Sequence, residues 1–172
     1  IEWGKYTPVL TVTDLEGDTD SYTRPIDVFT DYCAPVSGGF DQEMTQISFN
    51  GEVLDVSDQT IYDYTDTIIS VTSGGNLHLV TQGTTGTDNA EDWGVWLDLN
   101  NDGVFDSSPN SIEILYDDNS DDSEHYGLDI QLTLPEGVSD EPLRLRVSGE
   151  FGSQKPCTGR IKSTVDVYIQ FQ

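Results

Sequence analysis

Residues 93–106 read Trp-Gly-Val-Trp-Leu-Asp-Leu-Asn-Asn-Asp-Gly-Val-Phe-Asp. This stretch combines the pattern of a β-strand with that of a polar loop, and it carries the main prediction of the fold. Over residues 93–99 large apolar side chains recur at every second position, a pattern typical of a β-strand with one buried face. The residues expected on that face are Trp93, Val95, Leu97 and Leu99. Trp96 falls on the opposite face. We therefore expect a core strand that leads directly into the second half of the stretch.

That second half has the pattern D-x-N-x-D-G-x-x-D, whose spacing wraps oxygen ligands around a hard cation. The predicted Ca²⁺ ligands are the side chains of Asp98, Asn100, Asp102 and Asp106 and the main-chain carbonyl of Val104. A helical EF-hand would have a bidentate glutamate at the twelfth position, but Pro109 stands there and a strand precedes the loop. The pattern thus predicts a calcium loop of an extracellular module, with an affinity of about 10⁻⁴–10⁻³ M. A metal-free turn rich in Asp, Asn and Gly is the alternative.

The net charge of the chain limits the kinds of molecule that it can bind. Its 172 residues include 32 acidic and 7 basic side chains, which gives a formal net charge of −25. Such a chain would be repelled by nucleic acid and by anionic lipid surfaces. No run of 18 apolar residues is present, so membrane insertion is not expected. The acidic load suits a salt-rich, for example marine, medium or one that contains millimolar divalent cations.

The chain has two cysteines, Cys33 and Cys157, and neither belongs to a C-x-x-C unit. No arrangement of histidines beside them suggests zinc. An even pair in an acidic chain fits one disulfide formed in an oxidising compartment. Two buried free thiols are the alternative.

Short alternating segments separated by turns extend along the whole chain, and no segment has a sustained period of 3.6 residues. Asn50-Gly51 is the strongest hairpin signal. The predicted strands span 6–13, 20–29, 44–49, 52–56, 67–72, 77–82, 93–99, 111–116, 128–134, 142–148 and 161–171. Strands at this spacing predict an all-β protein, an antiparallel β-sandwich with Greek-key connections of the jelly-roll or immunoglobulin-like kind.

Sequence motifs for catalysis are absent, since neither G-x-S-x-G nor H-E-x-x-H occurs. Because the chain has 32 acidic residues, the sequence does not indicate which two of them could form a catalytic pair of carboxylates. We therefore predict no catalytic residue and no enzyme. Carbohydrate binding is the alternative function, because exposed aromatic rings stack on sugars. The candidate rings are Trp96, Trp93, Tyr126 and Trp3, with Trp96 favoured because it opposes the core face.

Several motifs, taken together, resemble a known family. They are Tyr32-Cys33, Tyr62-Asp63-Tyr64-Thr65, the segment 96–105, Leu132-Thr133-Leu134-Pro135, Leu143-Arg144-Leu145-Arg146-Val147 and Pro156-Cys157. In this order and spacing, residues 32–172 resemble the GEVED domain, an accessory module of secreted bacterial proteins. The motif that names the family is replaced here by Gly159-Arg160-Ile161-Lys162-Ser163, so no ligand role of its acids is carried over.

Residues 6–29 look like the last two strands of a PKD domain, an immunoglobulin-like spacer. We therefore divide the chain into a PKD-like hairpin at 1–30 and a GEVED-like calcium-binding sandwich at 31–172. The resemblance implies an exported multidomain bacterial protein, often a protease or a polysaccharide-degrading enzyme, that carries this part as a non-catalytic appendage. The expected function is a calcium-stabilised module, secreted or at the cell surface, that attaches to a polysaccharide or to another extracellular macromolecule.

Overall fold

The computed structural model describes most of the chain, and all other positions lie outside the description. The described residues are 4–6, 8–23, 26–28, 32–35, 44–56, 61–83, 92–108, 111–117, 127–138, 141–150, 155–157 and 161–172. Within them the regular elements are all strands: β1 (Gly4–Tyr6), β2 (Val9–Thr13), β3 (Thr19–Thr23), β4 (Ile26–Val28), β5 (Met44–Phe49), β6 (Glu52–Asp55), β7 (Ile61–Val71), β8 (Asn76–Gly83), β9 (Asp92–Leu97), β10 (Ile114–Asp117), β11 (Asp129–Thr133), β12 (Leu143–Glu150) and β13 (Ile161–Phe171).

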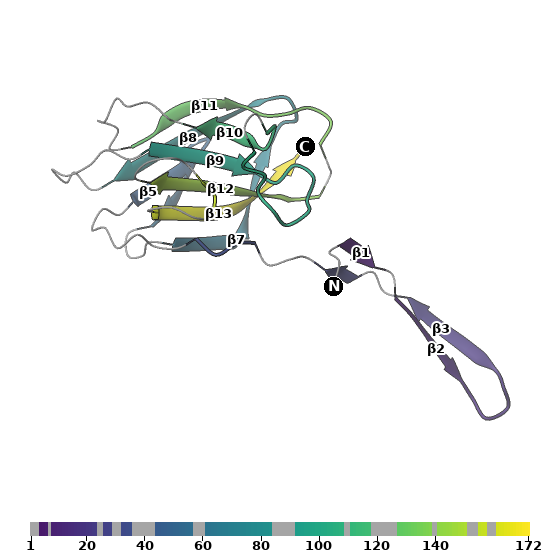
Figure 1. Cartoon of the computed structure of the whole chain (residues 1–172). Helices are drawn as coiled ribbons and strands as arrows, with labels where there is room; N and C mark the ends of the chain where they lie inside the picture. Colours follow the sequence, from purple (N-terminus) through teal and green to yellow (C-terminus); the bar gives the residue numbers. More distant parts are fainter. Residues whose placement is uncertain are drawn as a thin grey trace.

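Two packed sheets form the main body, as Figure 1 shows. One sheet has five strands in the order β10-β9-β12-β13-β7, and the other has four in the order β11-β8-β5-β6. The predicted all-β sandwich is confirmed. Among the described strands all pairs are antiparallel except β13 with β7, which run parallel and shift register between Val167 and Tyr168.

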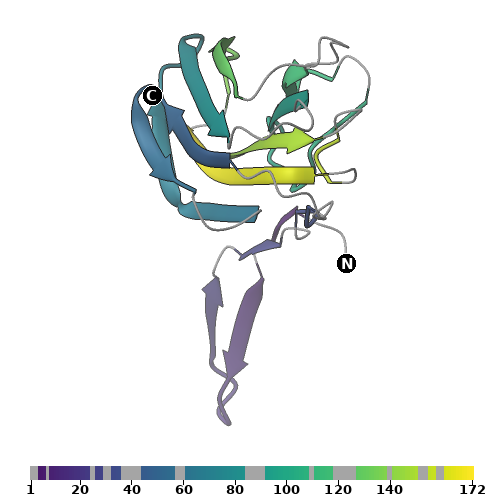
Figure 2. The ribbon, with the colours of Figure 1, turned by 90° about the vertical axis from the view of Figure 1, so that its left-hand side faces the viewer.

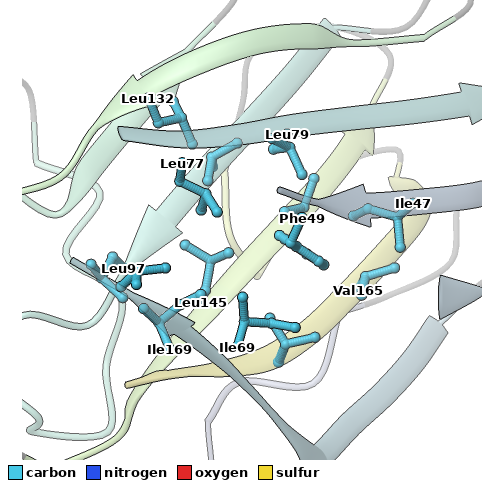
Figure 3. Packing of buried hydrophobic residues seen from close by; sticks show 14 of the residues in the cluster. Ile47, Phe49, Ile69, Leu77, Leu79, Leu97, Leu132, Leu145, Val165 and Ile169 are labelled. Atoms are coloured by element: carbon cyan, nitrogen blue, oxygen red, sulfur yellow. The ribbon is translucent and has the colours of Figure 1, made fainter. Parts of the chain in front are cut away.

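The core lies between the two sheets and consists of the apolar residues that alternate along their strands. Trp93, Val95 and Leu97 are buried in it and Leu99 packs against it, so the face predicted for this strand is correct. Figure 3 shows how side chains of the four-stranded sheet meet those of the five-stranded sheet. The labelled residues of the first set are Ile47, Phe49, Leu77, Leu79 and Leu132, and those of the second are Ile69, Leu97, Leu145, Val165 and Ile169.

Two turns illustrate how local sequence and topology combine. Asn50 and Gly51 both have positive φ, 51° and 85°, and join β5 to β6 as the predicted hairpin. By contrast, the turn at 72–75 joins strands of different sheets, because β7 pairs with β13 while β8 pairs with β5 and β11. Turn residues therefore predict where the chain reverses, but not which strand becomes the neighbour.

The N-terminal ribbon, β2 with β3, extends away from the sandwich (Figures 1 and 2). These two strands pair with each other, and every residue in them is exposed. Leu10 and Tyr22 face each other across the ribbon and remain largely in solvent. The domain boundary near residue 30 stays a prediction.

Candidate metal site

The predicted calcium loop starts where β9 ends, at a carboxylate that is fully buried. Asp98 has no exposed surface, and its two oxygens accept the main-chain N–H groups of Asp102 (3.1 Å) and Gly103 (2.9 Å). Asn101 and Gly103 have φ values of 53° and 83°, in the left-handed region that Gly and Asn tolerate. These features fold the loop back around the Asp98 carboxylate.

The other predicted side-chain ligands also bond to the loop backbone. Asn100 Oδ1 accepts the N–H of Asp102, and Asp102 Oδ1 accepts the N–H of Val104, both at 2.9 Å. Asp106 Oδ1 accepts the N–H and the hydroxyl of Ser108, and these bonds lower the pKa of Asp106. A carboxylate oxygen has two lone pairs, so Asp98 Oδ1 and Asp102 Oδ1, which accept one of these bonds each, keep capacity for a cation, whereas Asp106 Oδ1 already accepts two bonds. The loop is thus held in shape by its own side chains.

Glu113 joins this loop from the segment before β10, and the sequence analysis did not identify it. It is 3% exposed, and its Oε2 accepts the N–H of Asp106 at 2.7 Å. Burial first, and then the negative charges of Asp98 and Asp102, raise the pKa of Glu113. Glu113 lies outside the twelve-residue calcium pattern, and no rule of spacing connects it to Asp98. Its carboxylate is an acidic group from outside the pattern that bonds to the backbone of residues 98–108.

The chemistry of these groups fits a calcium ion. Asp98 and Glu113 are buried acids, and among the described residues neither forms an ion pair with a basic side chain. Burial of unpaired negative charge is costly, and a divalent cation with oxygen ligands would neutralise it. A Ca²⁺ ion has six to eight such ligands at about 2.3–2.6 Å, so oxygens on opposite sides of it lie about 5 Å apart.

A tighter group of carboxylates occurs elsewhere, in the turn between β2 and β3. Oxygens of Asp14, Glu16 and Asp18 lie within 4.8 Å of one another, whereas the carboxylates of the 98–106 loop are not grouped so closely. The three acids of the ribbon are exposed, and Asp14 Oδ1 accepts the N–H groups of Glu16 and Asp18. Such bonds are usual in a turn of this kind without a metal, so we assign no site there.

The expectation that Trp96 or Trp93 offers an exposed ring to a sugar is wrong. Trp93 is 0% and Trp96 is 1% exposed. Trp93 faces the core between the sheets, while Trp96 lies over Gly94 on the outer face of its sheet, beside Arg146 of β12. Strand periodicity assigned Trp96 correctly to the outer face, but other parts of the chain cover that face. Tyr126 and Trp3 lie outside the described residues.

The contact between Trp96 and Gly94 gives a first prediction. A Cβ added at Gly94 would lie 2.1 Å from Cη2 of the Trp96 ring. We therefore expect Gly94→Ala to lower the free energy of unfolding by about 1–3 kcal/mol through overpacking, measured by urea denaturation. In a Trp96→Val background the same change should cost much less, because the ring is gone. Equal costs in both backgrounds would contradict this explanation.

A second buried group on the outer face is the guanidinium of Arg146, which is 1% exposed. Its Nε and Nη2 donate to the two oxygens of Asp166 at 2.7 Å each. Its Nη1 donates to the main-chain carbonyls of Cys33 (2.9 Å) and Pro156 (2.7 Å). Cys33 and Cys157 are joined by the predicted disulfide, with their Cα atoms 5.4 Å apart. Arg146 thereby anchors both segments that carry the disulfide to the sheet.

Tyr32, the residue before Cys33, links this region to the candidate metal loop. Its hydroxyl donates to Asp98 Oδ2 at 2.5 Å. Its ring lies 5.0 Å from the Phe105 ring, and the guanidinium of Arg144 lies 4.5 Å from its centre. Burial and the bond to the Asp98 carboxylate raise the pKa of Tyr32 well above its usual value. The hydroxyl therefore stays protonated as a donor at neutral pH.

The fold and the site define a small disulfide-linked β-sandwich module that contains an Asp- and Asn-rich loop. Residues 92–166 match the family model of the GEVED domain, so the chain carries a GEVED domain, as its motifs predict. GEVED domains are accessory domains of secreted bacterial proteins. Comparisons with curated proteins and with solved structures returned no significant match. Among the described residues, no helix has the length and apolar character needed to cross a membrane.

Proposed function

We propose that this chain is a non-catalytic, calcium-stabilised accessory module of an exported multidomain bacterial protein. The observation that carries the calcium assignment is the pair of buried carboxylates, Asp98 and Glu113, at one loop without a basic partner among the described residues. A disulfide supports export, since such bonds persist in oxidising compartments. The charge of −25 supports a medium that supplies salt or divalent cations.

In this proposal a bound Ca²⁺ would neutralise the acidic loop and fix its conformation. Asp98, Asn100, Asp102, Asp106 and Glu113 would provide side-chain oxygens, and Val104 its main-chain carbonyl. The hydrogen bonds within the loop hold its backbone in a turn, and the carboxylates, which are not grouped as closely as those of the ribbon, would draw together on binding. The ion serves stability, and a partner would be contacted by the surface beside it.

The role of Glu113 is tested by isothermal titration calorimetry with CaCl₂. We expect Glu113→Gln to weaken calcium binding about 10-fold or more, because a charged oxygen ligand is lost. Glu52→Gln is the matched control, since Glu52 is an exposed acid on β6 and should leave binding unchanged. In EDTA, Glu113→Gln should keep or raise the melting temperature, because it removes a buried charge. Equal affinities for the two variants would exclude Glu113 as a ligand.

We further propose that the module attaches its parent protein to a polysaccharide or to another extracellular surface macromolecule. The burial of Trp93 and Trp96 removes these two rings as platforms for sugar stacking. A glycan array and a pull-down against bacterial cell-surface extracts, both with calcium present, test this attachment. Binding in neither assay would contradict attachment and favour a spacer.

A further inference from the structure

Residues 32–35, which we call the cap segment, lie on the outer face of the five-stranded sheet and are held there at three points. The disulfide joins Cys33 to Cys157, and Arg146 Nη1 donates to the Cys33 carbonyl at 2.9 Å. The Tyr32 hydroxyl forms the third attachment, to Asp98 at 2.5 Å. The disulfide fixes the cap segment to the segment before β13, Arg146 fixes it to β12 of the sheet, and Tyr32 fixes it to the candidate metal loop.

Tyr32 contacts the loop at two separate places. Its hydroxyl bonds to Oδ2 of Asp98, the first position of the loop, and the same oxygen accepts the N–H of Gly103. Its ring packs against Phe105, which lies between the carbonyl ligand Val104 and the acid Asp106. Phe105 is itself 3% exposed and also lies under the Arg146 guanidinium, at 4.9 Å. Tyr32 therefore orients both ends of the loop.

We propose that Tyr32 is a positioning residue of the calcium loop, and that the Cys33–Cys157 disulfide and calcium binding are thermodynamically coupled through it. Hydrogen-bonding partners of metal ligands fix the orientation of those ligands, and their loss typically weakens metal binding by about 10–100-fold. The closed disulfide holds Tyr32 in place, so calcium binds the oxidised chain more tightly than the reduced chain. This inference rests on the calcium site proposed above.

The coupling is reciprocal, since both equilibria involve the same folded chain. If oxidation tightens calcium binding by a given factor, calcium shifts the disulfide equilibrium towards the oxidised form by the same factor. In the reduction step a dithiol such as dithiothreitol supplies two electrons and two protons. The S–S bond breaks to give the thiols of Cys33 and Cys157, and the dithiol becomes a cyclic disulfide.

The first test compares Tyr32→Phe with Tyr22→Phe by calorimetric titration with CaCl₂. Tyr22 is exposed on the β2–β3 ribbon and serves as the matched control. We expect Tyr32→Phe to weaken calcium binding about 10-fold, while Tyr22→Phe binds as the wild type does. Near-UV circular dichroism in EDTA verifies that both variants are folded. Wild-type affinity in Tyr32→Phe would overturn the positioning role.

The second test equilibrates the chain with mixtures of reduced and oxidised dithiothreitol, in 10 mM CaCl₂ or in EDTA, and quantifies free thiols. We expect calcium to shift the disulfide equilibrium of the wild type about 10-fold towards the oxidised form, and to shift that of Tyr32→Phe much less. A purely structural tyrosine would not produce this difference. MgCl₂ at equal ionic strength is the control, because Mg²⁺ demands a tighter octahedral shell.

The two proposals fail in different ways. If the wild type shows no heat of calcium binding, the calcium site itself is wrong. If the wild type binds calcium but the disulfide equilibrium does not respond to it, only the coupling is wrong.

Discussion

Asp166→Asn is expected to lower the free energy of unfolding by about 3–5 kcal/mol, since it removes the counter-charge of a buried arginine. Asp166 is 4% exposed and binds Arg146 through both oxygens, while Arg144 Nη2 shares Oδ2 at 2.6 Å. An asparagine of the same shape retains one acceptor oxygen but no charge. Arg146, at 1% exposure, cannot recover its hydration in the folded state.

The natural control is Asp63→Asn, because Asp63 lies at the surface beside Arg144, which also binds Asp166. Its carboxylate lies 3.7 Å from Arg144 Nη2, and its side chain is 62% exposed. Surface ion pairs contribute about 0–1 kcal/mol, so this variant should unfold almost as the wild type does in urea. In Asp166→Asn combined with Arg146→Met, much of the stability should return, because no buried charge is left unpaired. Equal losses for Asp166→Asn and Asp63→Asn would contradict the role of burial.

Calcium at 10 mM is expected to raise the melting temperature by about 5–10 °C relative to EDTA. With a dissociation constant of about 10⁻⁴ M, the ion is present at about 100 times that constant and stabilises the fold by about 2.7 kcal/mol. For a chain of this length, about 1 kcal/mol shifts the melting temperature by about 2–4 °C. Differential scanning calorimetry measures the shift directly.

The control for this prediction must separate binding from screening, because a chain with a net charge of −25 is stabilised by any salt. NaCl at the same ionic strength should therefore give a clearly smaller shift. Asp98→Asn should abolish the calcium-specific part, whereas Asp20→Asn on the exposed ribbon should preserve it. If NaCl reproduces the whole shift, the loop does not bind calcium at this concentration.

The sequence by itself determined those features that depend on neighbouring residues. Alternation placed Val95 and Leu97 in the core, and Asn50-Gly51 specified a hairpin because both residues tolerate positive φ. The D-x-N-x-D-G spacing predicted a loop around Asp98. In the structure, the main-chain N–H groups of Asp102 and Gly103 donate to the Asp98 carboxylate. Motif order was sufficient to identify the GEVED domain.

Only the tertiary structure decided which groups from distant parts of the chain meet. A period of two residues assigns Trp96 to a face of the sheet, but the burial of its ring depends on which other parts of the chain pack on that face. Glu113, seven positions after Asp106, lies outside the twelve-residue calcium pattern. The bond from Tyr32 to Asp98 likewise has no sequence signal, since it arises from long-range packing. The parallel pairing of β13 with β7 has the same origin. Local sequence patterns determine the strands and the candidate metal loop. Contacts between remote segments determine which hydrogen bonds reach the loop from outside it.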